Sequence, residues 1–269
     1  MHHYLNGPVF AVAPMIDWTD RHCRYFHRQL APEALLYTEM LVADAVIHGD
    51  RQRLLGFDRA EHPVAIQLGG LAAMRRAVSI PVTVKCRIGV DDQDPETALD
   101  ELADCAVDAG VSAIWVHARK AWLKGLSPKE NRDIPPLDYD RVHRLKARMP
   151  DMFVGLNGGL ANVDQAAAQL GAVDGVMMGR GAYGDPADLA AVGPLIYGTA
   201  RKDVDYPALI ETMMRYADAH IAQGGRLAQV TRHMVGLFTG LPGARRWRQI
   251  LSEQAPRPNA SPGLIREAF

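Results

Sequence analysis

Short apolar runs alternate with amphipathic stretches along residues 9–178. Runs of four or five apolar residues are typical of buried strands, and the stretches between them repeat their apolar positions every three to four residues, as helices do. The expected strands are 9–13, 34–38, 64–68, 82–86, 113–117, 153–157 and 175–178, and the expected helices are 20–30, 71–78, 98–109, 139–147 and 163–170. This alternation predicts an α/β fold of the TIM (β/α)8 type, with a parallel sheet and helices outside it.

The strand count is one short of a closed eight-stranded barrel. Only residues 69–81 separate the strand expected at 64–68 from the one expected at 82–86, and they have room for one short helix. Because strand number, tilt and stagger are linked, a barrel without one strand closes poorly. Two explanations stay open: a strand has been overlooked, or one β/α unit is absent from the chain.

After Tyr206-Pro207 the pattern is helical throughout. The expected helices are 208–222, 227–238 and 245–252, and glycine-containing breaks separate them. We therefore expect a barrel domain at 1–205 and a small helical domain at 206–253. Residues 254–269 begin with a stretch rich in proline, alanine and serine, which predicts a loosely ordered tail.

The formal net charge of −1 conceals an asymmetry. From Arg226 to Phe269 there are seven arginines against two glutamates, so the rest of the chain carries the compensating negative charge. A basic helical domain on an acidic barrel indicates a nucleic-acid partner. Cys23, Cys86 and Cys105 have no paired spacing, which argues against a disulfide framework or a zinc site and fits a reducing cytoplasm. No apolar run reaches 18 residues, so we expect no membrane span.

Two glycine-rich turns follow neighbouring apolar runs near the end of the expected barrel. Residues 153–156 lead into Asn157-Gly158-Gly159, and residues 176–178 lead into Gly179-Arg180-Gly181. Late strand ends of a barrel lie side by side, and backbone N–H groups with one guanidinium can hold a phosphate there. This predicts a phosphorylated cofactor. The alternative is a pair of ordinary tight turns in which glycine serves only the backbone.

Polar side chains also end three other expected strands. An inward Lys85 would place a cation near a cofactor ring, where it stabilises negative charge on a reduced flavin. His117 can donate to a ring carbonyl or a phosphate, and the Gln67 amide can both donate and accept. The alternatives are a lysine that reaches solvent at the strand end and a histidine satisfied in the core.

Two basic segments suit RNA. The long stretch 120–136 carries Lys129 and Arg132 together with Trp122, and basic residues beside an aromatic ring suit a phosphate backbone and an unstacked base. Arg245 and Arg248 share a face of the helix expected at 245–252, whereas Trp247 is expected to face inward. The alternative for both segments is a solvated surface.

Many of these motifs resemble those of bacterial tRNA-dihydrouridine synthases, and the A subfamily is the best fit. The similar segments include Val12–Arg24, Tyr37–Met40, Gln67–Gly70, Val84–Gly89, Val116–Ala121, Leu126–Arg132, Asn157–Gly159, Met178–Arg180, Arg232–Met234 and Gly243–Arg248. The resemblance covers nearly the whole chain.

The resemblance implies a flavin-binding TIM barrel followed by a helical tRNA-binding domain. It implies FMN as cofactor, NADPH as reductant, and hydride transfer to C6 of a flipped uridine at D-loop positions 20 and 20a of tRNA. The implied contacts to the flavin ring and ribityl chain are Pro14, Met15, Ile16, Gln67, Lys85 and His117; the implied phosphate contacts are Asn157, Gly158, Gly159, Gly179 and Arg180; the implied tRNA contacts are Lys129, Arg132, Arg245 and Arg248. We expect a monomer without a metal.

One departure from the family is serious. Its catalytic cysteine belongs to an Asn-x-Asn-x-Gly-Cys-Pro segment after the fourth strand, and this chain contains no Gly-Cys-Pro. The chain passes from Gly70 directly into Leu71, as if roughly fifty residues, a helix, a strand and most of a second helix of ordinary length, were missing. We therefore assign no catalytic residue. Cys86 is a poor substitute because neighbours on a strand point to opposite faces, so it points away from the side of Lys85.

Without a proton donor near C5 of the uridine, we expect product formation to be slower by on the order of 10²–10⁴. Three functions stay open: a synthase of reduced activity, an inactive form that still binds tRNA, and a small-molecule flavin oxidoreductase similar to dihydroorotate dehydrogenases. The basic helical domain argues against the third.

Overall fold

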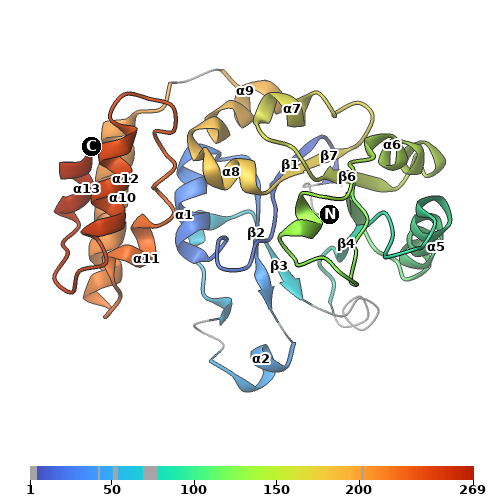
Figure 1. The fold of residues 1–269 in the computed structure, drawn as a ribbon, viewed down its shortest axis with the longest axis horizontal. Helices are drawn as coiled ribbons and strands as arrows, with labels where there is room; N and C mark the ends of the chain where they lie inside the picture. Colours follow the sequence, from blue (N-terminus) through green and yellow to red (C-terminus); the bar gives the residue numbers. More distant parts are fainter. Residues whose placement is uncertain (1–4, 42, 51–53, 69–77, 201–202) are drawn as a thin grey trace. The chain divides into compact units, whose positions relative to one another are not determined.

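The computed structural model describes residues 5–41, 43–50, 54–68, 78–200 and 203–269 (Figure 1). These residues form two compact units. Unit 1 comprises Met1–Ala13 and Leu68–Gly179, and unit 2 comprises Pro14–Gln67 and Arg180–Phe269. The helix expected at 71–78, apart from Val78, and the junction between Gly70 and Leu71 lie outside the described residues.

All seven expected strands are present. They are β1 (Val9–Val12), β2 (Leu35–Leu41), β3 (Val64–Leu68), β4 (Thr83–Arg87), β5 (Ala113–His117), β6 (Phe153–Asn157) and β7 (Gly175–Met178). Their order in the sheet is β3-β2-β1-β7-β6-β5-β4. Consecutive strands are neighbours except β3 and β4, which are the two ends of this order, and the first strand pairs with the last, as in a TIM-type barrel. The expected fold class, a TIM-type barrel followed by a helical part, is confirmed.

The register of unit 1 stacks side chains in layers. Lys85, Trp115 and Gly155 lie opposite one another on β4, β5 and β6. The Trp115 ring occupies the space above two glycines, because a Cβ on Gly155 would lie 2.8 Å from its Cδ2 and a Cβ on Gly175 2.8 Å from its Cη2. Large and small residues therefore interlock across three strands, and Trp115 is completely buried.

The helices of unit 1 are α5 (Pro95–Asp108), α6 (Tyr139–Arg148), α7 (Val163–Ala167) and the 3-10 turn η3 (Glu130–Arg132). Figure 1 shows α5 and α6 side by side. The buried Arg141 of α6 joins them, because it donates to the carboxylate of Asp100 at 2.5 Å and to the carbonyl oxygen of Pro95 at 2.9 Å. Its Nη2 group also donates to the carbonyl oxygen of Glu96 at 2.9 Å, and a buried charge requires such partners.

The helical elements of unit 2 are α1 (Arg21–Leu30), α2 (Ala43–His48), η2 (Arg59–Glu61), α8 (Arg180–Gly184), η4 (Pro186–Ala191), α9 (Val192–Ile196), α10 (Tyr206–Ala222), α11 (Leu227–Thr231), α12 (Ala244–Glu253) and α13 (Gly263–Ala268). Near the C-terminus α13 packs against both α10 and α12 (Figure 1). Trp247 of α12 is buried and donates its indole N–H to the carbonyl oxygen of Met234 at 2.8 Å.

Two helices end earlier than the sequence predicts. The helix expected at 163–170 ends at Ala167 as α7. The pattern predicts a helix over 227–238, whereas α11 ends at Thr231 and turns follow it. Gly236 then approaches Gly184 so closely that a Cβ would lie 2.6 Å from the Gly184 carbonyl oxygen. The backbone beyond Thr231 continues in tighter turns, in which the Met234 N–H donates to the Thr231 carbonyl oxygen at 2.9 Å and the Leu237 N–H donates to the Met234 carbonyl oxygen at 3.0 Å. The boundaries at 205 and 253 and the loose tail stay predictions, although the last residues include α13.

Candidate functional site

Four side chains form one row at the C-terminal ends of neighbouring strands in unit 1. Arg87 pairs with His117, His117 with Asn157, and Asn157 with Met177. Lys85 lies two residues before Arg87 and therefore on the same face of the sheet. The register thus brings the predicted His117 and Asn157 together at the edge where barrel enzymes build their sites, and Lys85 lies two residues before that edge, in register with Trp115.

The two glycine-rich turns are adjacent. The side-chain amide of Asn157 donates to the carbonyl oxygen of Met177 at 2.6 Å, which ties the turn after β6 to the end of β7. Gly179 follows that end directly, and Arg180 begins α8. The Tyr139 hydroxyl donates to the carbonyl oxygen of Gly158 at 2.7 Å and fixes the first turn from its other side.

Glycine is required in the first turn. Gly158 has a φ of +112° and Gly159 a φ of +71°, values that side chains strain to adopt. A Cβ on Gly158 would also lie 3.0 Å from the His117 ring, and one on Gly159 3.0 Å from the Tyr139 hydroxyl. The turn therefore brings bare backbone close to the row of polar side chains. That arrangement fits a phosphate group, which binds backbone N–H donors.

Positive charge accumulates around this row. Burial lowers the pKa of Lys85 to about 8, and the Arg87 guanidinium adds to the shift. The Lys85 residue keeps an exposed surface, so water still reaches part of the side chain. Burial is the main cause that lowers the pKa of Arg87, and repulsion from Arg119 and Arg132 lowers it further. Clustered cations of this kind are stabilised by an anion.

The remaining predicted cofactor contacts belong to unit 2. Pro14 and Met15 are half-buried, and Ile16 is 63% exposed. The Met15 N–H donates to the Thr19 hydroxyl at 2.8 Å, which closes the turn that presents Ile16. Gln67 is half-buried near the end of β3, and Arg180 is exposed.

The predicted RNA contacts are exposed. Lys129 precedes η3 and Arg132 ends it, in unit 1. Arg245 and Arg248 lie exposed on α12 in unit 2, whereas Trp247 between them is buried, as the helical period indicates. Both pairs therefore present their guanidinium or ammonium groups to solvent.

None of the three cysteines is suited to proton donation. Cys23 is fully buried, which raises the pKa of its thiol, and burial raises the pKa of Cys86 to about 12. Cys86 also lies between Lys85 and Arg87 on β4 and so points to the other face. Cys105 is exposed on α5. The assignment of no catalytic residue stays a prediction.

Comparison with known proteins identifies the family. The model of the dihydrouridine synthase family (Dus) matches residues 11–72 and 70–264. The chain belongs to the dihydrouridine synthase family. It is 45% identical to the tRNA-dihydrouridine(20/20a) synthase of Xanthomonas campestris pv. campestris over 319 aligned positions, which cover 98% of this chain and 94% of the relative.

Other relatives carry the same name. The tRNA-dihydrouridine(20/20a) synthases of Shewanella oneidensis and Escherichia coli K12 are each 42% identical over 312 positions, covering 97% of this chain and 93% and 90% of the relative. The resemblance to the A subfamily is thereby confirmed. An N-acetylneuraminate lyase from Fusobacterium nucleatum, at 10% identity and 98% and 97% coverage, has a TM-score of 0.28, which is too low to support an argument.

Sequence reasoning on this dihydrouridine synthase family member missed one residue of the row, Arg87, and one residue that supports the turn beside it, Tyr139. Arg87 could have been found, because it follows Lys85 by two positions and so shares its face. Tyr139 had no local signal. It is the first residue of α6 and reaches Gly158 only through the fold.

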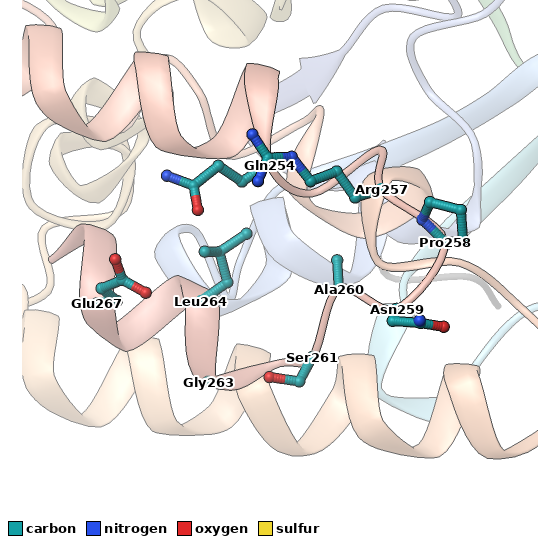
Figure 2. Close-up of a pocket in the computed structure, with 9 residues that line it drawn as sticks. All are labelled: Gln254, Arg257, Pro258, Asn259, Ala260, Ser261, Gly263, Leu264 and Glu267. Atoms are coloured by element: carbon teal, nitrogen blue, oxygen red, sulfur yellow. The ribbon is translucent and has the colours of Figure 1, made fainter.

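A separate cavity of about 480 Å³ lies in the C-terminal segment 254–267 (Figure 2). Its lining includes Arg257 and Glu267 and none of the predicted cofactor residues. The close-up shows the chain from Gln254 to Glu267 curving around it, so it is a feature of the α12–α13 connection. We assign it no part in the family's chemistry.

The described residues contain no group of three or more His, Cys, Asp or Glu side chains placed to hold a metal ion. None of their helices is long and apolar enough to cross a membrane.

Proposed function

We propose that this chain binds FMN and acts on tRNA, with NADPH as the reductant and uridine at D-loop positions 20 and 20a as the target. The observation that carries the proposal is the pair of adjacent turns, Asn157–Gly159 and Gly179, beside Lys85 and His117. The names of the relatives, tRNA-dihydrouridine(20/20a) synthases, support the substrate.

The residues of the proposed FMN site have separate tasks. Backbone N–H groups of Gly158 and Gly159, with Arg180, hold the phosphate of FMN. Lys85 keeps a positive charge near the ring, because a pKa of about 8 leaves it mostly protonated at neutral pH. His117 donates to the ring or ribityl region. Pro14, Met15, Ile16 and Gln67 complete the contacts, and reduced FMN supplies the hydride for uridine C6.

We also propose that one β/α unit of the family is absent between Gly70 and Leu71. The family model matches in two segments that meet at residues 70–72. The alignment to the Xanthomonas relative needs 319 positions, whereas this chain has 269 residues. β3 and β4, the strands on either side of residues 69–82, are the two ends of the strand order. The missing unit would contain the Gly-Cys-Pro segment.

A second function follows from that gap. Without the family's cysteine, a proton donor for uridine C5 is lacking, and the buried Cys23 and the half-buried Cys86 do not replace it. The chain would then bind FMN and tRNA and turn over slowly or not at all. The absence of Gly-Cys-Pro favours a form that binds without rapid turnover. The basic residues Lys129, Arg132, Arg245 and Arg248 suit RNA, and they favour tRNA over a small molecule as its ligand.

The test separates cofactor binding from catalysis. FMN is titrated into the purified chain and into Gly158→Ala, with flavin fluorescence as the readout. We expect the wild-type chain to bind FMN and the variant to bind it about 10–100 times more weakly, because Ala is strained at a φ of +112°. Failure of the wild-type chain to bind FMN would refute the proposal.

Catalysis is measured on an unmodified tRNA transcript with NADPH, and dihydrouridine is quantified by mass spectrometry. The matched control carries the relatives' segment inserted between Gly70 and Leu71. We expect the restored chain to be on the order of 10²–10⁴ times faster. Equal rates would show that the gap does not limit the reaction.

A further inference from the structure

One loop of unit 1 presents a large apolar side chain to solvent on an unusually well-anchored backbone. We define the basic loop as residues 120–136. Leu123 in this loop is 73% exposed, more than any other large hydrophobic side chain among the described residues. A single exposed leucine is ordinary on a protein surface, so the argument depends on how the loop holds it.

The base of the basic loop is paired with the chain after β4. The Ala121 N–H donates to the Gly89 carbonyl oxygen at 2.9 Å, and the Asp91 N–H donates to the Ala121 carbonyl oxygen at 2.7 Å. Arg87 adds two hydrogen bonds of 2.9 Å, to the carbonyl oxygens of Lys120 and Asn131. Arg87 of the row therefore joins the first residue of the loop to Asn131 in its second half.

The tip is held by two polar side chains. The Asp91 carboxylate accepts the Leu123 N–H at 2.7 Å. The buried Asn131 amide accepts the Trp122 N–H and donates to the Trp122 carbonyl oxygen, both at 2.6 Å. Both backbone groups of Trp122 and the N–H of Leu123 are thus satisfied inside the protein. Little entropy remains to be lost at these residues when a ligand meets the loop.

The charges around Leu123 suit a polyanion. The loop contains four cations, Lys120, Lys124, Lys129 and Arg132, against Glu130 and Asp133. The Glu130 carboxylate accepts the Ser127 N–H at 2.8 Å, and the Asp91 carboxylate is used by Leu123, so two nearby negative groups are directed at the protein's own backbone. Lys124 and Lys129 remain exposed.

We propose that Leu123 is a wedge that inserts against a nucleobase of tRNA and holds the stack open. The inference rests on the proposed function, because it names a device for the same substrate. Apolar side chains, leucine among them, are used by nucleic-acid-binding proteins to part stacked bases. A flipped uridine leaves a vacancy in its stack, and a rigid leucine between lysines can fill that vacancy while the ammonium groups hold the adjacent phosphates.

The test uses tRNA with 2-aminopurine next to position 20 of the D-loop, because its fluorescence rises when the base unstacks. Wild-type protein should raise the fluorescence. Leu123→Ala should lose most of the rise and bind the tRNA about tenfold more weakly. Leu123→Met, which keeps a long apolar side chain, should restore both. The matched control is Leu195→Ala, which truncates a 47% exposed leucine of α9 and should change neither.

A second pair of variants tests the anchoring. Asp91→Ala removes the acceptor for the Leu123 N–H and should reduce the fluorescence rise, although Leu123 is still present. Asp91→Asn keeps an oxygen acceptor and should recover it. FMN affinity should be unchanged in Leu123→Ala and Leu195→Ala, which shows that the fold and the cofactor site are intact.

The outcomes distinguish this inference from the proposed function. Wild-type protein that fails to bind tRNA contradicts the proposed function itself. Wild-type protein that binds tRNA while Leu123→Ala gives the same affinity and the same fluorescence rise contradicts only the wedge. Self-association that Leu123→Ala abolishes, without any effect on tRNA, would mean that a second copy covers Leu123 and would overturn the inference.

Discussion

Two buried histidines of α1 should make this protein sensitive to mild acid. Burial lowers the pKa of His22 to about 4, although Asp20 opposes the shift, and burial with repulsion from His233 lowers the pKa of His27 to about 3. Both rings are nearly inaccessible, at 6% and 1% exposure. Each folded-state pKa is therefore below the value of about 6.5 of an unfolded chain.

The sign and the size follow from proton linkage. Below pH 6.5 the unfolded state binds protons at these histidines and the folded state does not, so stability falls as the pH falls. The loss continues until the pH reaches about 4 for His22 and about 3 for His27. Between pH 7 and pH 5 each histidine should lower the free energy of unfolding by about 2 kcal/mol, because one pKa unit corresponds to about 1.4 kcal/mol.

The assay is urea unfolding of the wild-type chain, His27→Gln and His48→Gln at pH 7, 6 and 5. Glutamine cannot titrate, so His27→Gln should lose about 2 kcal/mol less than the wild-type chain between pH 7 and pH 5, whatever its stability at pH 7. His48 is exposed, and its variant should follow the wild-type slope. Equal slopes for wild-type and His27→Gln would refute the reasoning.

Further predictions concern the sheet, the phosphate turn and α12. Gly155→Ala should destabilise the fold by about 1–3 kcal/mol in urea unfolding, because the added Cβ would collide with the Trp115 ring. Adding Trp115→Leu to that variant should recover most of the lost stability, and no recovery would contradict the packing argument. Tyr139→Phe removes the donor to the Gly158 carbonyl oxygen and should weaken FMN binding about five- to tenfold by fluorescence titration; unchanged affinity would count against a role for that hydrogen bond. Arg245→Gln with Arg248→Gln should lower the slope of log Kd for tRNA against log salt by about 1.5–2, whereas Arg144→Gln, which removes an ion pair with Glu96, should leave it unchanged.

The sequence alone was sufficient to locate the strands. The apolar runs at 113–117, 153–157 and 175–178 form β5, β6 and β7 with the expected bounds. A strand that is buried on both faces of a parallel sheet is apolar at nearly every position, so its sequence is a continuous apolar run. The same reading placed His117 and Asn157 correctly at the ends of strands, whereas Lys85, expected to end its strand, lies in the middle of β4. The helix expected at 227–238 was wrong beyond Thr231, because Gly236 meets Gly184 through the fold, and no local pattern encodes that approach.

The tertiary structure decided which of these residues meet. The strand register aligns Arg87, His117 and Asn157, and the hydrogen bond from Asn157 to Met177 joins the turn after β6 to the end of β7. The packing of whole β/α units decides which strands are neighbours, and no single segment of sequence does so. Likewise, the sequence shows that 120–136 is basic. Only the folded chain shows that Asn131 is hydrogen-bonded to the backbone of Trp122 and that Asp91 accepts the N–H of Leu123. Hydrogen bonds between residues so distant in sequence leave no periodic signal, because periodicity reports which residues are buried and not which partners they have.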